Sequence, residues 1–196
     1  MTIALCVALV IITIYLVLRY FRIKNDSKDK DSLTEAYLKK DYDQYLAILN
    51  YKIGRAADVK DKNILATLKI QAYLPQRDWD KAQALYEQVD TKKLPKKIKL
   101  TFLCHYITML YLSGQADKAQ AFVQTNQKFL EEGQGNSGYS LYLDSFQALQ
   151  AFADQEYGKA QELFRELQNH PQANDFYREI FAEYLTKSQS LQAPDW

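Results

Sequence analysis

The stretch DWDKAQALY, residues 78–86, decides the fold, because related stretches recur along the chain. The others are DYDQYLAIL at 41–49, QADKAQAFV at 115–123 and EYGKAQELF at 156–164, so successive starts lie 37, 37 and 41 residues apart. A large apolar residue stands four positions before each stretch, at Tyr37, Leu74, Tyr111 and Phe152. Self-similarity at a nearly fixed period indicates a structure built from repeated units.

Each unit predicts two helices joined by a tight polar turn. The second helix carries a small residue at one position, where a neighbouring helix could approach closely: Ala82, Ala119 and Ala160. Aromatic side chains would wedge at the turn, at Tyr42, Trp79 and Tyr157. The whole chain has six Gly, four Pro and fifteen Tyr, a composition that suits long helices better than a turn-rich β fold. We therefore expect an all-α protein.

The segment Trp79-Asp80-Lys81-Ala82 resembles the start of the second helix of the tetratricopeptide repeat (TPR), where two polar residues and an alanine follow an aromatic or small residue. Further matching positions are Tyr73, Tyr86, Gly114, Ala148 and Phe164, and the resemblance covers residues 33–171. Tyr45 in place of Ala and Lys69 in place of a core Leu depart from the pattern. The resemblance implies an α-solenoid of about four TPR-like helical hairpins, with a generic helical-hairpin solenoid as the alternative.

A closing helix is predicted after the repeats. Pro171 ends one helix, and Asn174 or Asp175 can cap the next. Apolar residues then follow helical spacing at Tyr177, Ile180, Phe181, Tyr184 and Leu185. We expect a capping helix that covers the last apolar face, within a repeat domain at 32–190 and before a tail at 191–196. Trp196 in this tail is expected to fold back or to be disordered, with a docking role as the alternative.

The first 24 residues predict a membrane anchor. MTIALCVALVIITIYLVL, residues 1–18, carries no charge, and as a helix it would be about 27 Å long, close to the hydrocarbon thickness of a bilayer. A cleaved signal peptide is disfavoured, because no basic region precedes the apolar run and bulky residues follow it. A lipoprotein signal at Cys6 is disfavoured by the bulky Leu5 before it. The charged segment at 25–31 is expected to be a short linker.

The flanking charges predict the orientation of this single transmembrane helix. All the nearby basic residues follow the apolar run, at Arg19, Arg22, Lys24, Lys28 and Lys30. Cytoplasmic flanks carry an excess of Lys and Arg. We therefore expect the N-terminus outside and a soluble cytoplasmic domain, at a bacterial plasma membrane or, alternatively, on a eukaryotic organelle.

No pattern in the sequence predicts an enzyme, a cofactor or a metal site. The glycine-rich run at 133–138 lacks a lysine and follows no strand signal, so it does not predict a phosphate-binding loop. Cys104 and His105 are adjacent and would point about 100° apart on a helix, so they do not predict a zinc site or an activated thiol. The net charge of +1 gives no reason to expect nucleic acid as a partner, and nothing indicates a small-molecule substrate.

Five lysines form the strongest local charge feature, at Lys92, Lys93, Lys96, Lys97 and Lys99. They lie at a predicted helix start, where positive charge opposes the helix dipole. Contact with an anionic membrane surface is one interpretation. A solvated loop is the other.

The TPR resemblance implies a concave groove formed by the first helix of each unit. On the family register, nine residues would face it: Thr67, Gln71, Leu74, Thr101, Thr108, Tyr111, Tyr142, Ser145 and Phe152. For Tyr111 and Phe152, packing between repeats is the alternative. Uncharged polar and aromatic side chains would suit a mixed polar and apolar segment of another protein.

These expectations combine into a membrane-anchored TPR-like adaptor or scaffold, with a possible part in assembly or quality control of a membrane or envelope complex. The alternative is a structural subunit that contacts partners through its transmembrane helix. In both cases the partners are other proteins and the membrane, the latter through residues 1–24.

Overall fold

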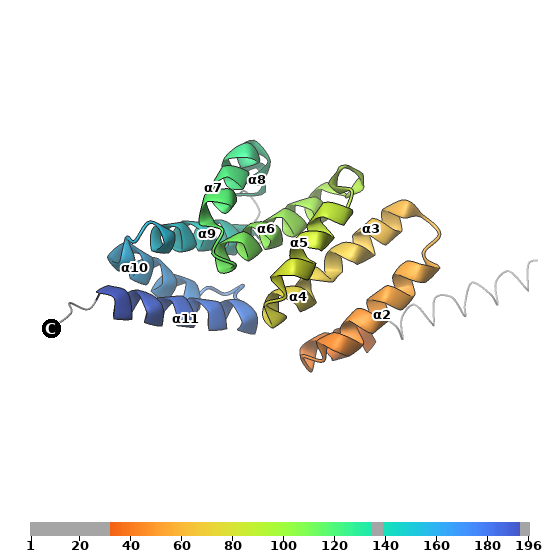
Figure 1. Cartoon of the computed structure of the whole chain (residues 1–196), viewed down its shortest axis with the longest axis horizontal. Coiled ribbons are helices and arrows are strands. Elements are labelled where there is room, and N and C mark those ends of the chain that lie inside the picture. The colour runs from red at the N-terminus through yellow and green to blue at the C-terminus, as the bar shows by residue number, and fades with distance from the viewer. Residues whose placement is uncertain (1–31, 135–138, 193–196) are drawn as a thin grey trace, which may run out of the picture. The chain divides into compact units, whose positions relative to one another are not determined.

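The computed structural model of the chain describes residues 32–134 and 139–192, and all secondary structure in these ranges is helical (Figure 1). The expected all-α class is therefore confirmed for this part of the chain. The chain divides into two compact units, residues 1–57 and 58–196, and each is described by itself.

The described part of the first unit is a single helical hairpin. A helix at residues 32–38 is followed by α2 (Tyr42–Arg55). The Asp41 carboxylate caps α2 by accepting a hydrogen bond from the backbone N–H of Gln44 at 3.0 Å. The Tyr37 ring lies 6.5 Å from the Tyr42 ring and 5.7 Å from the Tyr45 ring. Aromatic side chains therefore pack at this turn, as the repeat predicted.

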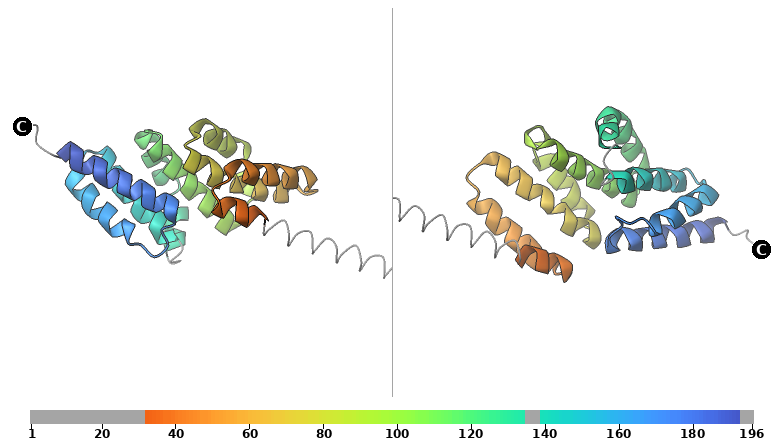
Figure 2. Two further views of the ribbon diagram at one scale, coloured as in Figure 1. Left: turned by 90° about the horizontal axis from the view of Figure 1, so that it is seen from below. Right: turned by 180° about the vertical axis from the view of Figure 1, so that it is seen from behind.

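The second unit continues the series of helices. Its elements are α3 (Val59–Leu68), α4 (Ile70–Gln76), α5 (Trp79–Gln88), the 3₁₀ helix η1 (Thr91–Lys93), α6 (Lys96–Leu112), α7 (Ala116–Thr125), α8 (Gln127–Gln134), α9 (Ser140–Ala153), α10 (Tyr157–Gln168) and α11 (Asp175–Gln192). Consecutive helices pack as the pairs α4/α5, α6/α7 and α9/α10, and α6 joins the pairs by contacting α4, α5 and α9. Figure 2 shows α10 and α11 running side by side.

The turns before α2, α5, α7 and α10 share one backbone geometry. Each has a residue in the left-handed region, at Lys40 (φ 57°), Arg77 (φ 56°), Gly114 (φ 77°) and Gln155 (φ 63°). In each turn this residue donates its N–H three residues back and the next residue donates five back, as in Arg77 N–H to Leu74 O and Asp78 N–H to Tyr73 O. This pair of bonds is the Schellman motif that ends a helix. The sequence repeat is thus repeated in the backbone.

The alanines of the repeat lie in the core. Ala82 on α5, Ala119 on α7 and Ala160 on α10 are each fully buried, with 0% of their surface exposed. A side chain limited to one methyl group lets two helices approach closely. These three positions therefore fix the distance at which each second helix packs on its neighbours.

Aromatic rings fill the space between α5, α6 and α7. The Tyr86 ring stacks on the Tyr106 ring at 3.7 Å with an interplanar angle of 9°. Phe102 stacks on Tyr86 at 5.8 Å, and Phe122 meets both tyrosines edge-on at 5.6 and 5.2 Å. Offset and edge-on ring pairs add roughly 0.5–1.5 kcal/mol each beyond burial. One hairpin is thereby joined to the next by rings.

The first helix of the second repeat is interrupted at Lys69. The Lys69 N–H bonds to Ala66 O at 3.1 Å, and the Ala72 N–H bonds to Lys69 O at 3.0 Å, so the chain tightens into three-residue turns there. Ile70 and Leu74 on α4 are buried, whereas Lys69 is only partly buried. Because of this tight turn, Ile70 and Leu74 pack in the core while Lys69 stays partly exposed.

The closing helix α11 forms where the sequence predicted it. Asn174 accepts a hydrogen bond from the Tyr177 N–H at 3.1 Å and so caps the helix. The Phe164 ring of α10 lies 6.2 Å from the Phe181 ring and 5.6 Å from the Tyr184 ring of α11. The apolar face of α11 thus covers α10, as expected for a capping helix.

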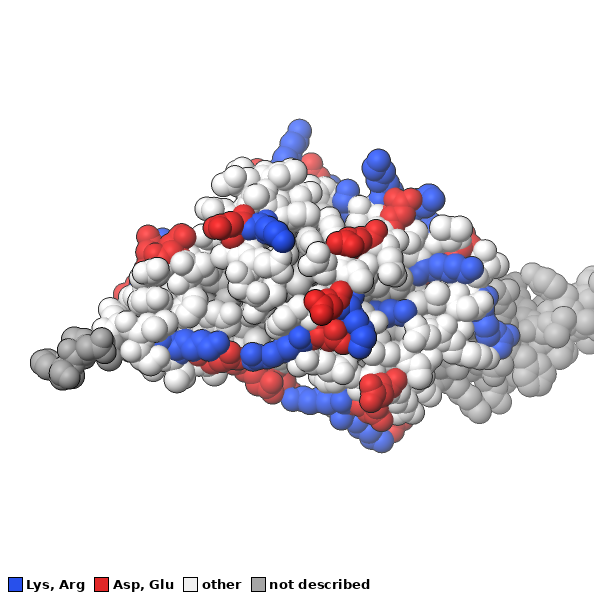
Figure 3. All heavy atoms as spheres, viewed as in Figure 1, with Lys and Arg blue, Asp and Glu red and all other residues white. Residues whose placement is uncertain are grey.

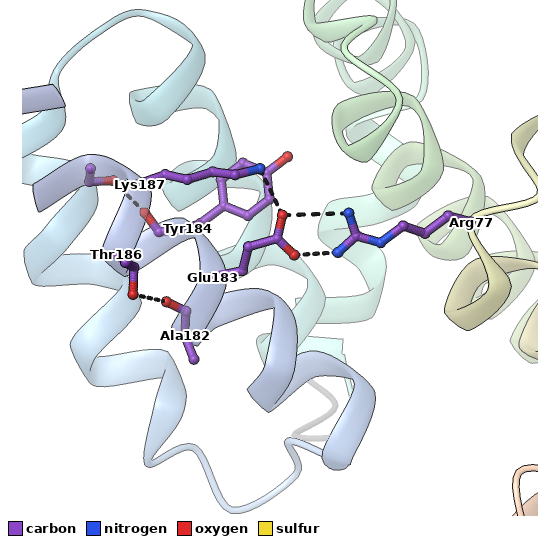
Figure 4. A network of polar contacts seen from close by, with 7 residues as sticks. Arg77, Ala182, Glu183, Tyr184, Thr186 and Lys187 are labelled. Atoms are coloured by element: carbon purple, nitrogen blue, oxygen red, sulfur yellow. Dashed lines mark hydrogen bonds and ion pairs between the residues drawn. The ribbon is translucent and has the colours of Figure 1, made fainter. Parts of the chain in front are cut away.

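An ion-pair network fastens α11 to the turn between α4 and α5 (Figure 4). The Arg77 guanidinium donates both terminal nitrogens to the Glu183 carboxylate, which also accepts from Lys187 Nζ at 2.7 Å. Burial disfavours the ionised Glu183, but the hydrogen bonds from Arg77 and Lys187 outweigh this and lower its pKa. The network connects residues 106 positions apart in the sequence.

The predicted anchor, residues 1–24, and the linker, residues 25–31, lie outside the described residues. Within residues 32–134 and 139–192, no helix is both long and apolar enough to cross a bilayer.

Candidate functional site

A pocket of about 240 Å³ lies between the helices α3–α4 and α6, the first helices of two successive hairpins. It is lined by Ile64, Thr67, Leu68, Gln71, Lys97, Ile98, Thr101, Phe102 and His105. Three of the nine predicted groove residues, Thr67, Gln71 and Thr101, are therefore brought together. Lys97 of the predicted lysine cluster joins them. Apart from these residues and His105 the walls are apolar, so the pocket combines an apolar surface with a few polar groups, as ligand sites commonly do.

His105 closes one end of this pocket from α6. Its side chain is 8% exposed, and its Nε2 lies 3.2 Å from the Tyr142 hydroxyl on α9. Burial lowers the pKa of His105 to about 4, because the imidazolium ion would lose its hydration there. His105 is therefore a neutral hydrogen-bonding group near pH 7. From the sequence, His105 is considered only as a zinc ligand beside Cys104, and this hydrogen-bonding role is not predicted.

A second tyrosine of the α9 end ties that helix to the pocket rim. The Tyr139 hydroxyl donates to the Lys97 backbone oxygen at 3.2 Å and lies 3.4 Å from Thr101 Oγ1. Thr101 Oγ1 also lies 3.1 Å from the same oxygen. The hydrogen bonds of Tyr139 and Tyr142 hold α9 against α6 beside the pocket.

Three predicted groove residues, Leu74, Thr108 and Ser145, lie in the core. At most 2% of each is exposed. The hydroxyl of Thr108 donates to the Cys104 backbone oxygen at 3.0 Å, and that of Ser145 donates to the Leu141 backbone oxygen. Because all three side chains are buried, and the two hydroxyls are satisfied inside the protein, these residues do not reach a surface where a peptide could lie. The repeat pattern predicts the helix on which each residue lies but not the depth of its side chain.

Tyr111 and Phe152 pack between helices. The Tyr111 ring stacks on Phe146 at 6.2 Å. Burial raises the pKa of Tyr111 to about 12, so the phenol stays protonated and donates to Gln150 Oε1 at 2.8 Å. The Phe152 ring lies 4.9 Å from the Tyr184 ring of α11. These are the contacts that the alternative interpretation, packing between repeats, expected.

The five clustered lysines occupy η1 and the first turn of α6, and several meet acidic or aromatic groups. The contacts are Lys93 Nζ to Asp90 at 3.2 Å, Lys96 Nζ to Glu132 at 2.6 Å and Lys99 Nζ at 4.9 Å from the Phe129 ring centre. On the face shown in Figure 3, basic and acidic side chains alternate without forming a large patch of one sign. Lys92 and Lys97 complete the cluster, and its contact with an anionic membrane remains a prediction.

Cys104 is buried on α6, next in sequence to the pocket residue His105. Burial raises the pKa of its thiol to about 12, because the thiolate would be poorly solvated there. Nucleophilic and metal-binding chemistry both require the thiolate. Cys104 therefore behaves as a small apolar core residue in this structure.

The other pocket-lining residues could not be recognised from the sequence. Ile64, Ile98 and Phe102 follow the same apolar periodicity as core residues, so their spacing does not distinguish a pocket wall from a core position. Only the contact between α3–α4 and α6 places them around a cavity.

No family model, no curated protein and no solved structure matches this chain. A proposal about its function therefore rests on the repeated hairpin geometry and on the pocket between α3–α4 and α6.

Proposed function

We propose that this protein is a membrane-tethered scaffold of TPR-like helical hairpins that binds a segment of another protein through its first helices. The observation that carries the proposal is the Schellman turn that recurs before α2, α5, α7 and α10 at the spacing of the sequence repeat. Similar turns favour a similar hairpin in each repeat, and hairpins that stack within residues 58–192 would leave their first helices along one surface. The proposed role is binding and includes no catalytic step.

The pocket between α3–α4 and α6 is the proposed contact for the partner segment. Gln71 and Thr101 supply polar groups at its walls, and Ile64, Ile98 and Phe102 supply apolar surface. A segment with one apolar side chain flanked by uncharged polar groups would satisfy both kinds of wall. This supports the mixed polar and apolar segment expected from the sequence.

Position-specific photo-crosslinking in intact cells tests this contact. We expect benzoylphenylalanine at Gln71 or Thr101 to crosslink a discrete partner band, because both positions line the pocket. The matched control carries the same group at Ala84, which is exposed on α5 and lies outside the pocket. Equal crosslinking from all three positions, or none from Gln71 and Thr101, would contradict the proposed contact.

The tether is proposed to be residues 1–24, with the N-terminus outside and the helical domain in the cytoplasm, at a bacterial plasma membrane. Tethering would raise the concentration of the scaffold near membrane partners. Protease treatment of spheroplasts and of inverted membrane vesicles tests the orientation. We expect digestion of the domain only in the inverted vesicles, and digestion in intact spheroplasts would reverse the topology.

A structural subunit that contacts its partner through the transmembrane helix is the second candidate, supported by the uncharged run at 1–18. Replacing residues 1–24 with an unrelated single-pass anchor distinguishes the two candidates. If the scaffold proposal holds, the Gln71 crosslink persists after the replacement. Its loss, with the protein still in the membrane, would favour the transmembrane contact.

A further inference from the structure

A second and larger pocket, of about 550 Å³, lies between α7–α8 and α9, away from the pocket of the proposed scaffold function. It is lined by Tyr111, Gln120, Val123, Gln124, Gln127, Leu130, Glu131, Leu143, Phe146, Gln147, Gln150, Ala151, Asp154 and Lys159. Figure 1 shows α7 and α8 above α9, on the far side of α6 from α3. The volume lies in the range of small-molecule and peptide sites, roughly 300–1,000 Å³.

Five glutamines form the walls of this pocket as two facing rows. Gln120, Gln124 and Gln127 recur at intervals of four and three residues along α7 and α8, and Gln147 and Gln150 lie three apart on α9. Residues three and four apart share a helix face. Gln120 and Gln124 therefore share one face of α7, and Gln147 and Gln150 share one face of α9, whereas Gln127 begins α8 after the turn at Asn126.

The floor of the pocket is apolar and its α9 wall is preorganised. Leu130, Phe146 and Ala151 are buried beneath the glutamines. The Tyr111 hydroxyl donates to Gln150 Oε1 at 2.8 Å, and Gln150 Nε2 donates to Asp154 Oδ1 at 2.8 Å. This chain of bonds fixes the orientation of one amide before any ligand arrives.

Three amides remain for a ligand. Within the described residues, the side-chain amides of Gln120, Gln124 and Gln147 make no hydrogen bond, and all three side chains are exposed. Each amide offers both a donor and an acceptor. A peptide group offers the same pair, so a row of amides can hydrogen-bond to the main chain of a peptide whatever its side chains are.

We propose that this pocket binds an extended peptide segment of a partner protein, with its main chain between the two glutamine rows and a basic side chain near Asp154 and Glu131. Gln120 and Gln124 lie about 6 Å apart along α7, at 1.5 Å per residue. An extended chain covers this length in about two residues. An apolar side chain of the segment would lie on Phe146 and Leu130.

Charge at the rim favours the basic side chain. Asp154 and Glu131 are both acidic. The charge of Lys159, which also lines the pocket, is paired with Glu156, a residue outside the pocket, at 2.7 Å from Nζ to the carboxylate. The rim therefore has an excess of negative charge, which attracts a Lys or Arg of the segment. The same charge disfavours an acidic segment.

Selection of phage-displayed random linear heptapeptides on the full-length protein in detergent micelles tests the proposal. We expect enrichment of peptides that join an apolar residue to a Lys or Arg. Synthetic copies should bind Gln124→Ala and Gln147→Ala at least about threefold more weakly, and the double variant about tenfold more weakly, as the loss of one and two hydrogen bonds predicts. Asp154→Asn should remove the preference for the basic residue.

The matched control is Gln88→Ala, which removes an exposed helical glutamine from α5, outside the pocket. It should bind the enriched peptides as the natural chain does. Absence of enrichment, or equal binding to the double variant, would overturn the proposal. Dimerisation of the natural chain that the double variant abolishes would also overturn it, because a second copy would then occupy the pocket.

Discussion

Replacing Gly114 with alanine isolates the energetic cost of the left-handed residue in the repeat turns. Gly114 has φ +77°, and a methyl group there would have no atom within 4 Å. Steric crowding therefore contributes nothing, and only the backbone conformation is penalised. The left-handed region costs an L-residue roughly 1–2 kcal/mol. Reduced entropy of the unfolded chain returns roughly 0.4–1 kcal/mol. We expect a net destabilisation of about 1 kcal/mol.

The reciprocal change, Gln155→Gly, occurs at the equivalent position of the turn before α10, where φ is +63°. Glycine relieves the same strain, and its greater unfolded-state entropy offsets part of the gain. We expect a net stabilisation of about 0.5–1 kcal/mol from the same two effects. The two substitutions should therefore have opposite signs although they affect the same motif.

Urea unfolding of the full-length protein in detergent micelles, followed by circular dichroism at 222 nm, measures both changes. In thermal unfolding followed by the same signal, the melting temperature should fall by about 2–4 °C for Gly114→Ala. Gly54→Ala on α2 is the control, because Gly54 lies inside a helix and its added methyl group would also have no atom within 4 Å. This control should be stabilising by about 0.5–1 kcal/mol. Gly114→Ala as stable as the natural chain would refute the strain argument.

Three further predictions concern burial and charge. The pKa of His105 is about 4 in the folded protein, below its unfolded value, so its contribution to stability is present above about pH 6.5 and is lost on acidification. Urea titrations should show a free energy of unfolding about 2 kcal/mol lower at about pH 5 than at neutral pH. The His105→Gln variant should not show this loss. Ala119→Leu should lower the free energy of unfolding by about 1–3 kcal/mol through overpacking of the core. Ala121 is exposed on the same helix, so Ala121→Leu should change the urea midpoint of unfolding little. A double-mutant cycle of Arg77→Gln and Glu183→Gln should give a coupling of at most about 1 kcal/mol that high salt removes, because the pair is partly exposed; a larger, salt-independent value would contradict this.

The features predicted best from the sequence were those with a local cause. The turn residues and the small residue of each second helix recur at fixed offsets, and the structure repeats them as Schellman turns and as the buried Ala82, Ala119 and Ala160. The closing helix was predictable as well, because Asn174 and the apolar spacing after it specify a start and a face.

The features missed depend on contacts between helices. Thr108 and Ser145 are polar and match groove positions, yet both bond to their own helix and are buried. Nothing local distinguishes such a hydroxyl from one that faces a ligand. The interruption at Lys69 likewise reflects which neighbours enter the core. The glutamine rows have helical spacing in the sequence, but only the packing of α7 and α8 near α9 makes them face each other.

Because Cys104 is buried, the rate at which its thiol is alkylated measures how often α6 opens. Burial raises the pKa of Cys104 to about 12 and shields its sulfur, so alkylation should proceed mainly when α6 separates from its neighbours. The labelling rate of a Cys6→Ser chain then reports how often this helix opens. Because the reagent can be added to intact membranes, the labelling rate can be measured without purifying the protein. Occupation of either pocket beside α6 should slow the labelling, which provides a readout of binding that needs no knowledge of the ligand.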